Sequence, residues 1–282
     1  LATIAILTPG GSILTRDVSA REMIEDIHIE SVDRLSRELH AMGHGEWVYR
    51  GQSDASWPLE SSFFRFANRV TRLRYGAQPL TGRAKLSWYR MLRKLEHNAF
   101  AEFRDHVAPR IAGQTPSTML SALSDMQHYG CPTRLLDFTC LPYVALFFAL
   151  EQGDSDCSLF AVRLSQLQSL EDSKGGGSRL WAEEGAEKPA VYIFTPPYTT
   201  ERIAKQKGAF LVPSTTILPF QDIADSAGLH IIRFVLPARL RAESVALLAK
   251  MNIAPASVYP ETEGQVRSLA WDIQAKVLSC PL

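Results

Sequence analysis

Apolar side chains recur at helical spacing early in the chain, in residues 31–42. Ser31 stands where an N-cap is favoured, and Gly43 follows the last apolar position, where a helix commonly stops. The apolar stripe between them consists of Val32, Leu35, Leu39 and Met42. This pattern predicts a helix with one buried face over residues 31–42.

Two further helical patterns precede the middle of the chain. One is a long helix that begins within an Arg- and Lys-rich stretch, residues 65–93. Its expected buried face is Leu86, Tyr89, Leu92, Leu95, Ala99 and Phe103. The other covers residues 117–129 and ends at Gly130.

Residues 143–150 are almost wholly apolar and follow Pro142, a residue well suited to the first turn of a helix. A helix that is apolar all round is buried on every side. We therefore expect this segment to lie in the core of the protein.

Strands are also predicted, in short runs that are rich in residues favoured in β-sheets. Strands are predicted at 47–50, 134–138, 159–162, 190–194, 209–212 and 230–236. Helices are also predicted after Pro237 and over 264–278, and residues 173–178 form a Gly- and Ser-rich excursion. Because helices dominate the first part and strands the second, the pattern indicates an α+β fold rather than alternating βαβ units.

Composition narrows the classes of protein that this chain represents. Of 282 residues, 46% are hydrophobic and 21% charged, which is typical of a folded globular protein. The formal net charge is +0, which argues against a protein dedicated to coating nucleic acid. A local basic patch stays open: Arg69, Arg72, Arg74, Arg83, Lys85, Arg90, Arg93 and Lys94 either guide a polyanion or form an ordinary solvated helix face.

Location is predicted from three features of the chain. The longest apolar run, residues 143–150, is far shorter than the roughly 18 residues that a membrane span needs. The apolar start lacks a basic segment and does not resemble a secretory signal. Four irregularly spaced cysteines suit reduced thiols better than disulfides or a metal site. We expect a cytoplasmic protein with no metal and no membrane partner.

Standard catalytic motifs are missing from the sequence. It has no GxGxxG, no P-loop, no HExxH and no GxSxG. Dinucleotide binding by a Rossmann fold, ATP hydrolysis, zinc proteolysis and α/β-hydrolase chemistry therefore lack their signatures.

The first segment with chemical promise is residues 47–52, in which Arg50 ends a buried strand and Gly51 follows it. An Arg at a strand end suits a phosphate or carboxylate, and a neighbouring Gly lets another group approach closely. The alternative is a structural Arg that pairs with a core acid such as Asp137.

The second segment is residues 127–139, which collects His, Tyr, Arg, Asp and Thr around a Gly-Cys-Pro turn. Polar groups placed beside a hydrophobic core must be paired or used in function. The sequence leaves open whether they form an internal network or a binding site.

These segments resemble the FRG domain family, which is named for a (Phe/Tyr)-Arg-Gly motif. Tyr49-Arg50-Gly51-Gln52 is followed by His128-Tyr129-Gly130 and then by Pro132 to Thr139 in the family's order. Residues 202–210 and 259–264 resemble two later blocks, so the similarity extends over about 47–270. The corresponding division is an N-terminal strand and helix extension, 1–44, and an FRG domain, 45–282, with a helical insertion at about 60–130.

FRG domains are distantly similar to ADP-ribosyltransferases, and this implies a mixed or antiparallel β core of that fold, with N-terminal and inserted helices. It also implies that NAD is bound as substrate. By the resemblance, the residues that bind NAD are Tyr49, Arg50, Gly51, His128, Tyr129, Arg134 and Thr139. The catalytic candidates are Glu261, Asp137 and Gln206, the last because the third-strand block reads Gln-Lys-Gly and lacks the catalytic Glu of ADP-ribosyltransferases.

Three functions follow, from different classes. The leading one is an NAD-dependent ADP-ribosyltransferase, a bacterial toxin or anti-phage effector that modifies a nucleic acid or a protein and is neutralised by an antitoxin. The second is a catalytically inactive module that binds a nucleotide, RNA or a protein, which the missing Glu favours. The third is a hydrolase that uses Asp137, His128 and Glu261.

Overall fold

The structure is a computed structural model. It describes residues 3–7, 13–17, 24–76, 80–112, 118–170, 180, 189–196, 201–216, 218–260, 264–269 and 271. Its strands are β1 (Thr3–Leu7), β2 (Ile13–Asp17), β3 (Ile24–His28), β4 (Trp47–Gln52), β5 (Leu136–Thr139), β6 (Cys157–Arg163), β7 (Gln168–Ser169), β8 (Val191–Phe194), β9 (Gly208–Pro213) and β10 (Ile231–Leu236).

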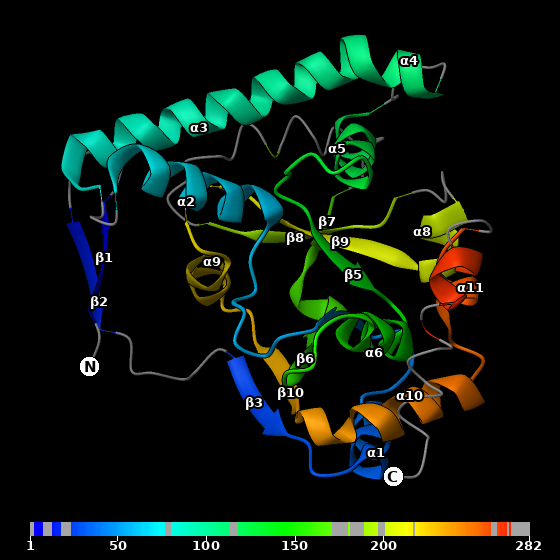
Figure 1. Ribbon diagram of the computed structural model, residues 1–282. Helices are drawn as coiled ribbons and strands as arrows, with labels where there is room; N and C mark the ends of the chain where they lie inside the picture. The colour runs from blue at the N-terminus through cyan, green and yellow to red at the C-terminus, as the bar shows by residue number, and fades with distance from the viewer. Residues whose placement is uncertain are drawn as a thin grey trace.

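The helices lie on both faces of one large sheet (Figure 1). They are α1 (Val32–Ala41), α2 (Ser62–Tyr75), α3 (Gly82–Glu102), α4 (Ala108–Ala112), α5 (Met119–His128), α6 (Pro142–Glu151), α8 (Glu201–Gln206), α9 (Phe220–Ala227), α10 (Arg241–Lys250) and α11 (Pro255–Val258). A π-helical turn, Phe103–Val107, joins α3 to α4. Residues 264–269 are helical as well.

Eight of the described strands form a mixed sheet in the order β3-β10-β6-β4-β5-β9-β8-β7. The two outermost pairs, β3 with β10 and β7 with β8, are parallel, and the inner pairs are antiparallel. β1 and β2 form a separate antiparallel pair. The predicted α+β class with a mixed β core is confirmed.

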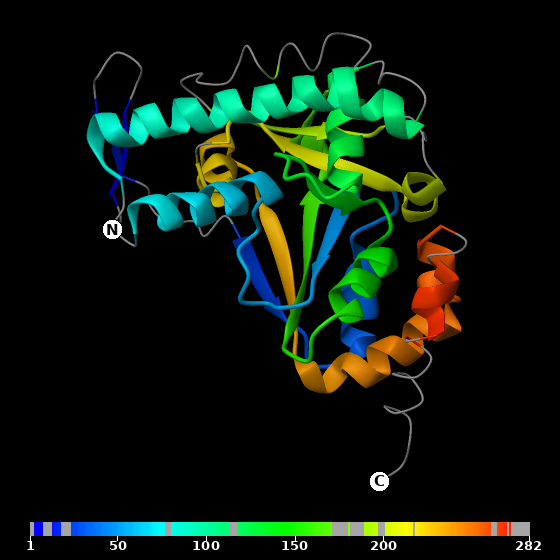
Figure 2. The ribbon, with the colours of Figure 1, turned by 45° about the horizontal axis from the view of Figure 1, so that its top comes forward.

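The central strand β4 shows why the two faces of the sheet differ. Successive side chains of a strand point to opposite faces, so Trp47 and Tyr49 share one face with Gly51 while Val48 and Arg50 share the other. The first face packs against α6, α1 and α10, and Figure 2 shows these helices below the sheet. Arg50, the first residue of the candidate site, lies on the second face.

Helix α6 is buried as its composition predicts, since Leu146, Phe147 and Ala149 have no exposed surface. The helix lies so close to β4 that a Cβ atom on Gly51 would come within 1.9 Å of the Ala145 carbonyl oxygen. Gly51 is therefore required for helix–strand packing, and the helix backbone occupies the space that its missing side chain leaves.

Helix α1 confirms the first helical prediction. The Ser31 hydroxyl accepts a hydrogen bond from the Arg34 amide at 3.2 Å, and Val32, Leu35 and Leu39 are buried. The strand that precedes it, β3, was not predicted from the sequence. It pairs with β10 at the edge of the main sheet, so residues 24–41 pack into the same core as the strands that follow.

The predicted buried face of α3 is partly wrong. Leu95 is 51% exposed and Ala99 is exposed, whereas Leu92 and Phe103 are buried as expected. The buried face runs instead through Trp88, Leu92, Glu96 and Phe100, spaced four residues apart. The reason is tertiary: Glu96 turns inward to pair with Arg134, and the face that carries Leu95 turns outward.

Other boundaries differ by a few residues, and some elements were missed. The strand expected from residue 134 begins at Leu136. Arg134 and Leu135 precede it and are not part of a strand. Helices α2, α4, α8, α9 and α11 were not predicted as separate elements. The excursion at 173–178 and residues 272–278 of the last predicted helix lie outside the described residues.

In the part of the chain that the structure describes, no helix combines the length and apolarity needed to cross a membrane.

Replacement of Gly51 by Ala tests the close packing of α6 on β4. The added Cβ would overlap backbone atoms of Ala145 and Ala149, so we expect a loss of about 3 kcal/mol in the free energy of unfolding, measured by urea denaturation. Gly45→Ala is the matched control, because Gly45 has φ of +78° but no atom within 4 Å of the added Cβ. It should cost about 1 kcal/mol. Equal losses for the two variants would contradict the packing argument.

Candidate functional site

Arg50 and Asp137, the residues on which the sequence-based hypothesis depended, lie side by side. Arg50 Nη1 donates a hydrogen bond to the Asp137 backbone oxygen at 2.8 Å. The same nitrogen lies 3.6 Å from the Asp137 carboxylate, whose side chain is 66% exposed. The main bond of Arg50 is therefore to the backbone, and the carboxylate stays open to solvent.

The path of β4 and β5 explains this contact. The two strands pair only at Tyr49 and Thr139 within the described residues, although β4 pairs with β6 along its whole length. Backbone groups that leave a ladder need other partners. The guanidinium of Arg50 supplies one, since it binds the Asp137 carbonyl.

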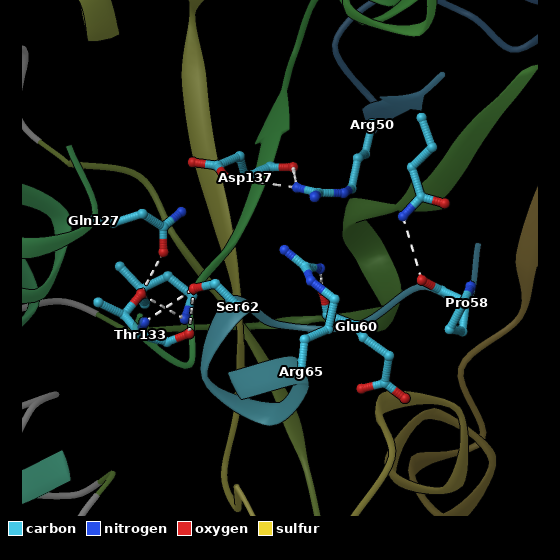
Figure 3. Close-up of polar contacts among 10 residues, drawn as sticks. Arg50, Pro58, Glu60, Ser62, Arg65, Gln127, Thr133 and Asp137 are labelled. Atoms are coloured by element: carbon cyan, nitrogen blue, oxygen red, sulfur yellow. Dashed lines mark hydrogen bonds and ion pairs between the residues drawn. The ribbon is translucent and has the colours of Figure 1, made fainter. Parts of the chain in front are cut away.

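A small pocket lies beside this contact. Its volume is about 130 Å³, and it is lined by Arg50, Glu60, Ser62, Arg65, Gln127, Gly130, Cys131, Leu135 and Asp137. Figure 3 shows the guanidinium groups of Arg50 and Arg65 turned toward the same space, between the start of α2 and the ends of β4 and β5. Two cationic groups that share a pocket favour an anionic guest.

The start of α2 places Arg65 at the pocket. The Ser61 hydroxyl caps the helix by accepting the Phe64 amide at 3.2 Å, and Phe63 and Phe64 are buried beneath it. Arg65 Nη1 donates to the Glu60 backbone oxygen at 2.6 Å. Cap and buried rings together fix where the exposed guanidinium points.

Glu60 is the buried acid of the pocket and is only 6% exposed, whereas Asp137 is open to solvent. Its Oε2 accepts a hydrogen bond from the Phe220 amide at the first turn of α9, at 3.2 Å. Burial raises the pKa of Glu60 to about 7, and nearby Asp222 adds to the rise, whereas the Phe220 amide and Arg65 oppose it. Glu60 is therefore partly protonated near neutral pH.

The guanidinium of Arg50 is also largely withdrawn from water, with 17% of its side chain exposed. Burial lowers its pKa, Asp137 opposes that change, and Arg65 adds to it. Its Nε is buried and has no hydrogen-bond partner among the described residues. Asp137 already provides an ion pair and a backbone acceptor for Nη1, and an anion in the pocket would add a second negative partner for the guanidinium.

The turn after α5 forms another wall of the pocket. The Thr133 hydroxyl bonds to Gln127, and the Ser62 hydroxyl donates to the Thr133 backbone oxygen at 3.0 Å (Figure 3). His128 and Tyr129 are exposed beside it, with ring centroids 5.0 Å apart and planes at 70°. Their proposed stacking on a ligand stays a prediction.

Four of the predicted ligand residues lie elsewhere. Tyr49 is 3% exposed in the core, where burial raises its pKa to about 12. Gly51 packs under α6. The Thr139 hydroxyl donates to the Gln206 backbone oxygen at 2.5 Å and accepts the Leu141 amide, which fixes the start of α6.

Arg134 is the fourth. It has no exposed surface, and its Nε donates to Glu96 Oε1 at 3.1 Å in an equally buried ion pair between the loop before β5 and α3. Such a pair fixes one arrangement of the elements that carry it, and removing one partner would leave an uncompensated charge. Arg134 does not line the pocket.

The other two catalytic candidates are not placed at the pocket. Gln206 ends α8, and its side-chain amide donates to the Val258 backbone oxygen of α11 at 3.3 Å. Glu261 lies outside the described residues, so its role stays a prediction.

Sequence reasoning missed Glu60, Ser62, Arg65 and Gln127 as pocket residues. Arg65 begins the Arg- and Lys-rich stretch at 65–93, but the sequence assigned it no role. One signal was available in the sequence. Glu60 precedes and Arg65 follows residues 61–64, which consist of a capping Ser, a second Ser and two Phe residues, so both charges had to lie near one buried helix start.

The fold is α+β with a mixed sheet, and a small pocket lies beside Arg50 of β4. Residues 45–157 match the model of the FRG domain, which confirms the predicted resemblance to this family. The match includes the Tyr49–Gln52 and 128–139 segments but neither of the two later blocks. Comparison with curated proteins and with solved structures gave no match.

The raised pKa of Glu60 predicts how stability changes with pH. Between pH 4.5 and about 7 the folded protein keeps a proton that the unfolded chain releases, so the contribution of Glu60 to stability falls as pH rises. Glu60→Gln keeps an acceptor for the Phe220 amide and removes the charge. We expect it to be neutral at pH 5 and stabilising at pH 8, measured by urea denaturation at both values. An effect independent of pH would contradict this assignment.

Proposed function

We propose that this FRG domain binds a phosphate-bearing nucleotide, with Arg50 and Arg65 as ligands of the phosphate. The observation that carries the proposal is that both guanidinium groups line one pocket. Arginine donates several hydrogen bonds in a fixed plane that suits phosphate oxygens. Ser62 and Gln127 add neutral polar groups to the same wall.

The volume of the pocket limits what enters it. About 130 Å³ is well below the roughly 300–1,000 Å³ of pockets that enclose whole small-molecule ligands. It suits one phosphate-sized group, so the rest of a nucleotide would lie across the rim. His128 and Tyr129 do not line the pocket, but they are exposed and lie in sequence between the lining residues Gln127 and Gly130, and an exposed aromatic pair suits a base or nicotinamide ring.

NAD is the nucleotide that we propose first, because the motifs resemble a family distantly similar to ADP-ribosyltransferases. The mixed sheet with β4 and β5 parting beside Arg50 supports a proposed relationship with that fold. The residues present suit its pyrophosphate through Arg50 and Arg65. When bound, NAD would supply the ribose–nicotinamide bond as the reactive group.

Arg65→Gln tests the nucleotide site without disturbing the core, because Arg65 is exposed. We expect affinity for NAD and ADP to fall about tenfold or more, since a charge-assisted phosphate contact is lost, as measured by isothermal titration calorimetry. Arg83→Gln on α3 is the matched control and should bind as the wild type does. The proposal fails if neither NAD nor ADP binds the wild-type protein, or if the two variants behave alike.

A second candidate function is transfer of ADP-ribose from NAD, and the open carboxylate of Asp137 favours it. In this reaction the bond between nicotinamide and ribose breaks, positive charge grows on the ribose, and an acceptor oxygen or nitrogen bonds to it as nicotinamide leaves. An ionised carboxylate near the ribose stabilises that charge. Asp137 is exposed at the pocket and 3.6 Å from its nearest cation.

Asp137→Asn separates transfer from binding. Arg50 bonds to the backbone oxygen of Asp137, so the substitution keeps that contact and removes only the charge. We expect NAD to bind as before and nicotinamide release to fall about 100-fold, measured by chromatography. Asp154→Asn, in an exposed loop, serves as control. If the wild type releases no nicotinamide, the protein is a binding module instead of a transferase.

The acceptor, a neutralising antitoxin, a role in phage defence and a cytoplasmic location all stay predictions. None of them affects the expected results for Arg65→Gln and Asp137→Asn.

A further inference from the structure

Charge is distributed very unevenly along this electrically neutral chain. Between residues 61 and 95 stand nine Lys and Arg residues and not one Asp or Glu, although the whole chain has 30 of each sign. This segment contains all of α2 and most of α3. A solvated helix face in an ordinary protein mixes both signs, so the excess calls for an explanation.

Helix α2 carries part of this excess in an ordered stripe. Arg65, Arg69 and Arg72 follow one another at spacings of four and three residues, which places them on one helix face. All three are exposed, while Phe63 and Ala67 on the opposite side are buried against Trp88 and Leu92 of α3. The stripe therefore faces away from the helix pair and into solvent.

The stripe begins at the pocket, because Arg65 is both its first residue and a pocket residue. From there, Arg69 and Arg72 extend it by roughly 6 and 10 Å along the helix axis. None of the three forms an ion pair with a described residue. A chain of phosphates carries negative charge at repeated intervals, so it is the ligand that matches a row of cations along a helix.

Apolar and aromatic side chains accompany the cations. Phe66 is 37% exposed, and the Arg69 guanidinium lies over its ring at 5.8 Å from the centroid. Leu73 is 80% exposed farther along the same helix. Cations beside an open aromatic face are typical of surfaces that bind single strands, since unpaired bases stack on the rings.

We propose that the outer face of α2, through Arg69, Arg72 and Phe66, binds a single-stranded nucleic acid that leads into the pocket at Arg65. Only the binding of the strand's end rests on the proposed nucleotide site; the contacts along α2 do not depend on it. It names the substrate class of that site, since a strand held along α2 brings a terminal phosphate or nucleotide to Arg50 and Arg65.

Charge reversal on the stripe is the test. Fluorescence anisotropy with a labelled 20-nucleotide single strand at several salt concentrations should show binding that weakens steeply with salt. The double variant Arg69→Glu with Arg72→Glu should bind at least about tenfold more weakly at low salt. The slope of log K against log salt should fall by about 1.4, or 0.7 for each lost phosphate contact.

The matched control is Arg83→Glu with Arg90→Glu, which changes the net charge equally on exposed positions of α3. It should keep most of the affinity and the slope of the wild type. Phe66→Ala should weaken single-strand binding by about fivefold or more and leave any duplex binding unchanged. Circular dichroism of each variant shows whether it folds.

The outcomes separate this inference from the proposed nucleotide site. Arg69→Glu with Arg72→Glu should still bind ADP as the wild type does, whereas Arg65→Gln loses ADP. If ADP does not bind but the strand binds through Arg69 and Arg72, the surface stands and the nucleotide site fails. Equal losses for the α2 and α3 variants, a duplex bound as tightly as the single strand, or equal competition by polyglutamate would each overturn the inference.

Discussion

The candidate site depends on the point at which β4 and β5 stop pairing. The strands join at Tyr49 and Thr139 and then separate, which frees the Asp137 carbonyl for the guanidinium of Arg50. If the ladder continued, Arg50 would have no reason to turn toward β5, and the space beside it would be closed by backbone. The pocket is thus a consequence of an interrupted strand pair in the middle of a sheet.

Because side chains alternate along β4, the adjacent residues Arg50 and Gly51 lie on opposite faces of the sheet. Gly51 faces α6, where the helix backbone leaves no room for a side chain, and Arg50 faces the pocket on the other side. The Arg-Gly pair therefore joins a packing requirement to a position in the pocket. Gly51 is needed for the packing of α6, and only Arg50 lines the pocket.

Two buried acids, Glu96 and Glu60, differ in their surroundings: the first is part of a buried ion pair and the second lines the pocket. Glu96 pairs with Arg134 away from the pocket, which explains both the altered face of α3 and the absence of Arg134 from the site. Among the described residues, the Glu60 carboxylate has no ion-pair partner and accepts a hydrogen bond only from the Phe220 amide, and burial raises its pKa to about 7. Only the second acid can respond to a ligand that enters the pocket.

Periodicity and local motifs determined α1, the buried helix α6 and most strands, and they pointed to Arg50 and Asp137 as candidate residues, because these depend on residues close in sequence or on composition alone. Tertiary structure decided the rest. The sequence does not show that Glu60 and Arg65 meet Arg50, because their approach depends on where α2 and α9 dock. It also could not tell Arg134 from a ligand residue, since the buried partner of Arg134 lies 38 positions away on α3.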